Sequence, residues 1–167
     1  MTGVQTCALP IWLRKSRHGR AQVGLLASSG AKRIKSHGVQ VTGTLDIENW
    51  LLRLEDDIRS SAYLEHAATE SQIHGLELDW TCVCWGADLR HDSASWQFKK
   101  LHGNAWMNED NARNQILQLN KYHILLSRAR EGMVVWVPPG DESDATRQPG
   151  FYDGTFEYLK ACGIPEL

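Results

Sequence analysis

The sequence lacks the long apolar run that a membrane-spanning helix needs. Such a helix takes about 20 consecutive, mostly apolar residues, and no apolar run in these 167 residues approaches that length. We therefore expect a protein that does not contact the membrane.

Cysteine is also scarce. The chain has four, and Cys7 lies in a first stretch that we set aside below. The remaining three, Cys82, Cys84 and Cys162, are an odd number without an even framework of spacings. This pattern argues against a disulfide scaffold and favours reduced thiols in a cytoplasmic protein.

A complete phosphate-binding loop is missing as well. The stretch "VGLLASSGAKRIK", residues 23–35, has an apolar strand, a small-residue turn and a basic continuation. A P-loop needs four residues between its glycines and then Lys-Ser/Thr, but five residues separate Gly24 from Gly30, and Ala31 stands at the lysine position. With no Walker A lysine and no Walker B acid, the chain alone is not expected to hydrolyse ATP.

The first residues do not look like part of a fold. Residues 1–11, "MTGVQTCALPI", match the translation of a common sequencing-library adapter, so we exclude them. We interpret residues 12–20 as a truncated lead-in and residues 21–167 as one domain. We therefore expect this chain to be the C-terminal piece of a longer protein.

Composition fits one soluble globular domain, with 42% hydrophobic and 23% charged residues. The net charge of −2 hides an asymmetry, because seven basic residues precede the first acid, Asp46. They are Arg14, Lys15, Arg17, Arg20, Lys32, Arg33 and Lys35. Such a patch indicates either contact with phosphate or nucleic acid, or a solvated basic face.

Apolar patterning predicts strands that alternate with helices. Strands are expected at residues 23–27, 38–41, 64–68, 79–85 and 133–140, and helices from about 31, over 46–61, over 109–130 and over 154–163. In the helix at 109–130, the spacing predicts one buried face, formed by Ile116, Leu119, His123, Leu126 and Ala129, and a stop at Gly132. Residues 88–108 show no clear period and are expected to be irregular, and residues 141–150 to form a loop. The order predicts an α/β fold, with a mainly parallel sheet and helices on both faces.

Two stretches resemble motifs V and VI of superfamily 1 helicases. In "ATESQIHGLELDW", Thr69 stands six residues before Gly75-Leu76-Glu77, and "YHILLSRAREGMVVWV" contains Ser127-Arg128-Ala129-Arg130. Together with "VGLLASSGAKR" and "FYDGTFEYLKACGI", these blocks resemble the Schlafen group 3-like DNA/RNA helicase family, domain of unknown function 2075. The resemblance implies a second RecA-like domain of the P-loop NTPase type, truncated at its N-terminal side. Its partners would be DNA or RNA and a missing N-terminal domain, and its cofactors ATP and Mg²⁺ held mainly by that missing half.

Arg128 is the expected catalytic residue. An ATP bound between two RecA-like domains needs a guanidinium to neutralise charge on the γ-phosphoryl oxygens, an effect of about 10³ to 10⁵ in rate. A surface salt bridge is the alternative use of an arginine at a helix end. Arg130 could assist, or could pair with Glu131 or Asp141.

By the same resemblance, Gly75 allows close approach of the nucleotide, and Glu77 binds the ribose or positions the γ-phosphate site. Thr69, with Ser71 or Gln72, would contact the nucleic-acid backbone, since hydroxyls and amides suit phosphate oxygens.

The chain departs from the family pattern at two positions. His74 and His123 stand where the family favours Gln and Arg. His74 can still donate a hydrogen bond, whereas His123 would weaken a nucleotide contact made there.

Three other groups of residues each have both a functional and a simpler structural interpretation. Cys82 and Cys84 with His74 or His91 suggest zinc, but buried thiols also behave as small hydrophobes, and no metal site is expected. The acids Asp141, Glu142 and Asp144 suggest a nuclease or a solvated loop. The tryptophans at 85, 96 and 106 suggest base stacking or core packing. The expected function is therefore half of an ATP-dependent helicase or translocase; the alternative is a non-catalytic RecA-like module that binds nucleic acid or protein.

Overall fold

The computed structural model describes residues 13–15, 18–19 and 21–166. The stretch 1–11, and with it the assignment to adapter sequence, lies outside these residues. The strands, in chain order, are β1 (Val23–Ala27), β2 (Gln40–Val41), β3 (His66–Ala68), β4 (Leu78–Cys84), β5 (Leu89–His91), β6 (Trp96–His102), β7 (Ala105–Asn108) and β8 (Ala129–Trp136). The α-helices are α2 (Ile47–Leu52), α3 (Ala112–Leu126) and α4 (Asp153–Ala161), and the 3₁₀ helices are η1 (Lys32–His37), η2 (Ser61–Tyr63) and η3 (Pro149–Phe151).

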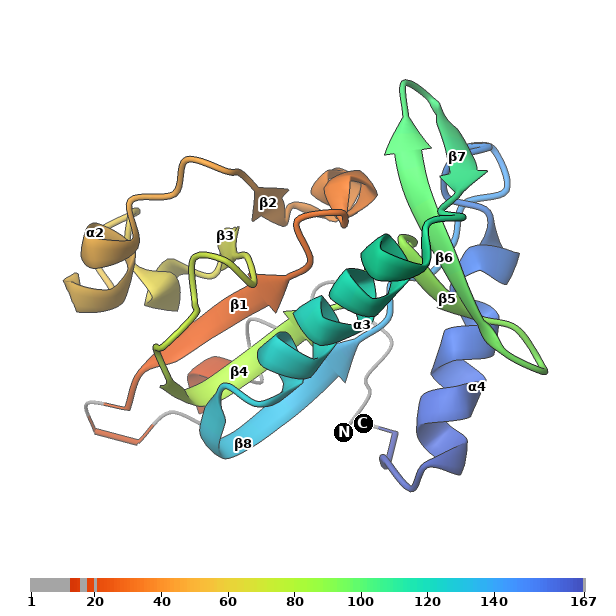
Figure 1. The fold of residues 1–167 in the computed structure, drawn as a ribbon. Helices are drawn as coiled ribbons and strands as arrows, with labels where there is room; N and C mark the ends of the chain where they lie inside the picture. Colours follow the sequence, from red (N-terminus) through yellow and green to blue (C-terminus); the bar gives the residue numbers. More distant parts are fainter. Residues whose placement is uncertain (1–12, 16–17, 20, 167) are drawn as a thin grey trace.

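A five-stranded parallel sheet forms the centre of the molecule, in the order β2-β3-β1-β4-β8 (Figure 1). Every residue of β1 is buried, as expected of a central parallel strand. The predicted strands at 23–27 and 79–85 are confirmed, and those at 38–41 and 64–68 shorten to β2 and β3.

Two hydrophobic clusters cover the two faces of this sheet. Successive residues of β4 alternate between them: Val83 packs with Tyr122 and Leu125 of α3, while Cys82 and Cys84 pack with Ile34 of η1. Figure 1 shows α3 lying across the sheet above β4 and β8. The predicted α/β architecture with a mainly parallel sheet is confirmed.

The expectation of irregular structure at 88–108 is wrong. Strands β5, β6 and β7 form a separate antiparallel sheet beside the parallel one (Figure 1). Only Gly103 and Asn104 join the paired residues His102 and Ala105, and Gly103 has a φ of 59°. A two-residue turn with a glycine at positive φ is typical of a tight hairpin. The Gly-Asn dipeptide is therefore the sequence feature that indicates this hairpin.

The helix predicted over 46–61 is only six residues long. Asp46 caps its start as expected, by accepting a hydrogen bond from the Asn49 amide (3.2 Å). After Leu52 the chain leaves the helix, and the Ser60 hydroxyl donates to the Arg53 carbonyl (2.8 Å). Such local side-chain bonds compete with a helical backbone.

Helix α3 buries a different face from the predicted one. Ile116 is 59% exposed and Leu119 is 40% exposed, whereas Gln118, Tyr122 and Leu125 face the core. Periodicity failed here because a polar residue occupies a core position, where the Gln118 amide donates to the Asp88 and Lys99 carbonyls.

The end of α3 also differs from the prediction. The helix ends at Leu126, and Gly132 lies in β8 rather than after a helix. A Cβ at Gly132 would lie 2.2 Å from the Trp80 ring, so this position has no room for a larger side chain.

In the described part of the chain, no helix has both the length and the apolar character that crossing a membrane demands.

Candidate functional site

Arg128 lies between the end of α3 and the start of β8, at the edge where the parallel strands begin. Its side chain is half-buried, with Nε donating to the Ile124 carbonyl (3.1 Å) and Nη2 donating to the Ser127 hydroxyl (2.9 Å). Both acceptors are neutral, and among the described residues no carboxylate forms an ion pair with Arg128. Its guanidinium is thus partly exposed at the protein surface and is held only by neutral groups of the described residues.

The segment Gly75–Glu77 reaches the same edge from the other side of the fold. The Leu78 amide donates to the Arg128 carbonyl (3.0 Å), and Leu78 is in register with Ala129. Gly75 is exposed with a φ of 81°, and Glu77 is exposed. The two sequence motifs, about fifty residues apart in the chain, are thus neighbours in space.

Arg130 has a different environment from Arg128. Its Nη2 forms an ion pair with Asp79 rather than with Glu131 or Asp141, the two partners considered from the sequence. Glu131 instead accepts a hydrogen bond from the Trp80 indole (2.8 Å).

The predicted nucleic-acid contacts lie at the opposite edge, where the parallel strands end. Thr69 follows β3 and is 2% exposed, with its amide and hydroxyl both donating to the Gln72 side-chain oxygen (2.9 Å each). Gln72 donates in turn to the Thr42 carbonyl (3.1 Å), while Ser71 is exposed. Thr69 and Gln72 therefore hold the turn, and Ser71 presents a hydroxyl to solvent.

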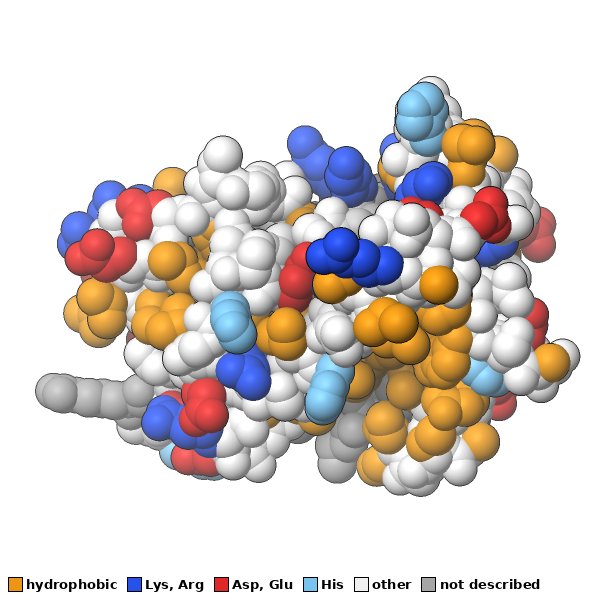
Figure 2. Space-filling view, viewed as in Figure 1, with side chains coloured by type: hydrophobic (Ala, Val, Ile, Leu, Met, Phe, Trp, Pro, Cys, Tyr) orange, Lys and Arg blue, Asp and Glu red, His pale blue; other side chains and the backbone are white. Residues whose placement is uncertain are grey.

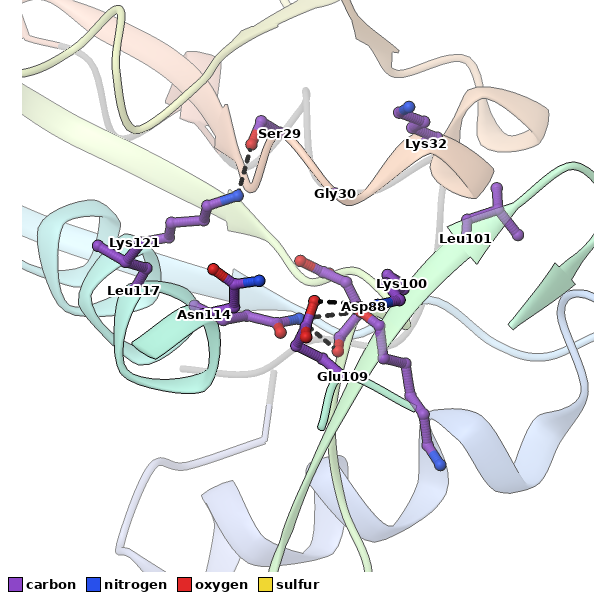
Figure 3. Close-up of a pocket in the computed structure, with 12 residues that line it drawn as sticks. Ser29, Gly30, Lys32, Asp88, Lys100, Leu101, Glu109, Asn114, Leu117 and Lys121 are labelled. Carbon is purple, nitrogen blue, oxygen red and sulfur yellow. Dashed lines mark hydrogen bonds and ion pairs between the residues drawn. The ribbon is translucent and has the colours of Figure 1, made fainter. Parts of the chain in front are cut away.

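A cleft of about 320 Å³ opens at this carboxyl edge, and sequence reasoning missed it (Figure 3). Its walls are the turn after β1, strand β6 and helix α3. The charged residues that line it are Lys32, Lys99, Lys100, Lys121, Asp88 and Glu109. These residues come from three distant parts of the chain, so no local sequence pattern predicts that they line one cleft.

Glu70 ties the cleft to the Thr69–Gln72 turn. Its carboxylate accepts hydrogen bonds from the Ser29 amide (2.8 Å) and hydroxyl (2.6 Å), and lies 3.3 Å from the Lys121 ammonium. Burial opposes ionisation of Glu70, but the hydrogen bonds from Ser29 outweigh it and hold the pKa of Glu70 below its usual value. Figure 3 shows the Lys121 ammonium pointing at Ser29 across the cleft.

Asp88 forms the buried floor of the cleft. Its carboxylate accepts hydrogen bonds from the Ser28 hydroxyl (2.6 Å) and the Tyr122 hydroxyl (2.7 Å), and burial raises the pKa of Asp88. A Cβ at Gly30 would lie 2.5 Å from this carboxylate, and one at Gly86 would lie 2.4 Å from it. The two glycines therefore allow the turn after β1 to pack against Asp88.

With this geometry established, the chain can be compared with known families. Residues 6–139 match the family model described as Schlafen group 3, DNA/RNA helicase domain. The chain belongs to this family. No curated protein and no solved structure matches the chain.

In this Schlafen group 3 domain, the three tryptophans considered as stacking platforms serve packing. Trp85 is buried and stacks on Trp96, with ring centroids 5.9 Å apart, while the Trp106 indole donates to the Thr146 carbonyl (2.8 Å).

The acidic stretch of this Schlafen group 3 domain is a network of ion pairs. Arg147 bridges Asp141 (2.6 Å) and Asp144 (2.8 Å), and Arg33 joins Asp144 (2.8 Å). The network fixes the loop after β8 to η1.

The cysteine pair lies inside the central sheet. The Cys82 and Cys84 sulfurs are 4.0 Å apart and buried in β4. Across the described residues, no group of three His, Cys, Asp or Glu side chains is placed to hold a metal ion.

Three of the early basic residues that the structure describes have different surroundings. Lys32 lines the cleft, Arg33 pairs with Asp144, and the Arg14 guanidinium donates to the Tyr63 carbonyl (3.4 Å). Arg17 and Arg20 lie outside the described residues.

Proposed function

We propose that this chain is the second RecA-like domain of a superfamily 1 type helicase or translocase of the Schlafen group 3 family. In this proposal, Arg128 is an arginine finger that completes an ATP site whose phosphates and Mg²⁺ are held by an N-terminal RecA-like domain. Family membership supports a helicase-related function; the assignment of motifs V and VI goes further.

One observation carries the assignment. The backbone of the Gly75–Glu77 segment lies beside that of Arg128, through the Leu78 hydrogen bond, at one edge of a parallel sheet. A nucleotide at this edge would meet a glycine that lets it approach, a carboxylate suited to ribose hydroxyls and a guanidinium suited to phosphate oxygens. The lack of a carboxylate partner in the described structure supports Arg128 over Arg130 as the finger.

The assignment separates two tasks between the two edges of the sheet. Gly75, Glu77 and Arg128 lie where the strands begin, and Ser71 lies where they end. Nucleotide binding and contact with nucleic acid would therefore occur at opposite edges, coupled through the segment 69–77 that runs between them.

Replacing Arg128 tests the finger directly. In the protein that joins this chain to its ATP-binding half, Arg128→Ala should leave ATP affinity nearly unchanged but reduce nucleic-acid-stimulated turnover by about 10³ or more, because the guanidinium acts mainly on charge that develops in the transition state. Turnover and nucleotide binding are measured side by side.

The matched control is Arg59→Ala, which removes an exposed arginine that pairs with Asp57. This variant should keep wild-type turnover. Near-wild-type turnover of Arg128→Ala would remove the finger assignment and leave the alternative, a RecA-like module that binds without catalysis. Sequence upstream of this chain decides the same question, since the helicase proposal requires G-x-x-x-x-G-K-[ST] after a strand there.

A further inference from the structure

The cleft at the carboxyl edge is locally basic in a protein of net negative charge. The whole chain carries a formal charge of −2, but four lysines line the cleft against two acids, Asp88 and Glu109. Figure 2 shows Lys and Arg side chains over η1, α3 and the β6–β7 hairpin, and others over α2 and the lower left edge of the same face. Because the chain as a whole carries a net negative charge, this concentration of lysines indicates a site for an anion.

The lysines differ in how firmly they are held. Lys121 lies 2.9 Å from the Ser29 hydroxyl and 3.3 Å from Glu70, and Lys100 lies 3.5 Å from Glu109. Lys32 is exposed on η1 and forms no ion pair with any described residue. In Figure 3, Lys121 and Lys32 lie on opposite sides of Gly30, and both line the cleft.

The remaining lining residues favour a backbone ligand over a small molecule. Pockets for small molecules are lined mainly by apolar and aromatic side chains, whereas this cleft has two leucines and no aromatic residue. Without a ring to stack on, a base gains little here. Asn114 on α3 also lines the cleft and carries an amide, a group suited to phosphate and sugar oxygens.

We propose that this cleft binds the sugar-phosphate backbone of a single nucleic-acid strand, with Lys121 and Lys32 contacting successive phosphates and Lys100 supporting them from β6. The proposal rests on the proposed function for one step, the identification of the bound anion as nucleic acid. It concerns the edge of the sheet opposite to Arg128, and the Glu70–Ser29 hydrogen bonds make the site continuous with the Ser71 turn.

Binding of a labelled oligonucleotide to this 167-residue chain, without ATP, tests the proposal. Lys32→Glu and Lys121→Glu should each weaken binding by about 3- to 10-fold, equally for oligo(dT) and for a mixed sequence, because phosphate contacts carry no sequence information. Each should also reduce the slope of log affinity against log salt by about 0.7, the value per phosphate contact on a single strand.

The matched control is Lys160→Glu, which makes the same charge change on α4, where Lys160 pairs with Glu166. It should bind like the wild type. Because the assay contains no ATP, its outcome does not depend on the finger assignment. Circular dichroism of each variant checks that it is folded. Lys32→Glu is the variant least expected to disturb folding, because the Lys32 side chain is exposed.

Three results would overturn the proposal. The first is no binding by the wild-type chain, and the second is cleft variants with the affinity and salt slope of Lys160→Glu. The third is displacement by inorganic phosphate as effective as by an oligonucleotide at equal phosphate concentration, which would make the cleft a small-anion pocket.

Discussion

Arg128 and Arg130 lie only two positions apart, but their different backbone positions give their guanidinium groups different partners. Arg130 extends from β8 and pairs with Asp79 of the neighbouring strand β4. Arg128 precedes the strand, so its guanidinium turns back to the neutral groups of Ile124 and Ser127. Sequence could identify the pair, but not which one lacks a carboxylate.

Gly75 is the residue of the Gly75–Glu77 segment whose identity the backbone requires. Its φ of 81° is a conformation that side chains with a Cβ disfavour, although nothing lies within 4 Å of an added Cβ. Gly75→Ala should therefore lower the free energy of unfolding by about 1 kcal/mol through backbone strain alone. Urea denaturation measures the change.

Gly43→Ala is the control for this substitution, since Gly43 also has open space around it but no positive φ in that range. It should be neutral or slightly stabilising. Equal destabilisation by the two substitutions would show that the backbone at Gly75 does not adopt the left-handed conformation.

At the scale of elements, continuous apolar runs were the reliable signal. Strand β1 is such a run, and β4 is rich in aromatic, β-branched and cysteine residues; both were predicted close to their observed bounds. The hairpin β6–β7 was missed because the half-buried β6 and the exposed β7 carry charged and aromatic residues without a clear alternation. The face of α3 was wrong because Gln118 is buried by hydrogen bonds to carbonyls, which periodicity does not detect.

Helix α3 supplies a stability test of the corrected face. Leu125 is 0% exposed and packs against the sheet, so Leu125→Ala should cost about 2–5 kcal/mol of unfolding free energy. Leu119 belongs to the predicted face but is 40% exposed, and Leu119→Ala should change stability by less than about 0.5 kcal/mol. Comparable losses in denaturant titrations would mean that the sequence-based face is the buried one.

At the scale of the whole molecule, the site consists of two edges of one parallel sheet. Motif spacing predicted which segments carry Arg128, Gly75 and Thr69, but their division between the edges follows from strand direction in the assembled sheet. The lysine cleft was beyond prediction, because Lys32, Lys100 and Lys121 become neighbours only when η1, β6 and α3 pack together.

Chemical rescue of Arg128→Ala tests the central claim most directly. In the protein that contains both halves of the ATP site, free guanidinium at millimolar concentration can occupy the space left by the missing side chain and supply the same charge. We predict that guanidinium raises the nucleic-acid-stimulated turnover of Arg128→Ala. The control Arg130→Ala should turn over ATP at close to the wild-type rate, and guanidinium should not change that rate. An Arg128→Ala variant that needs no rescue, because it already turns over ATP at the wild-type rate, would contradict the account.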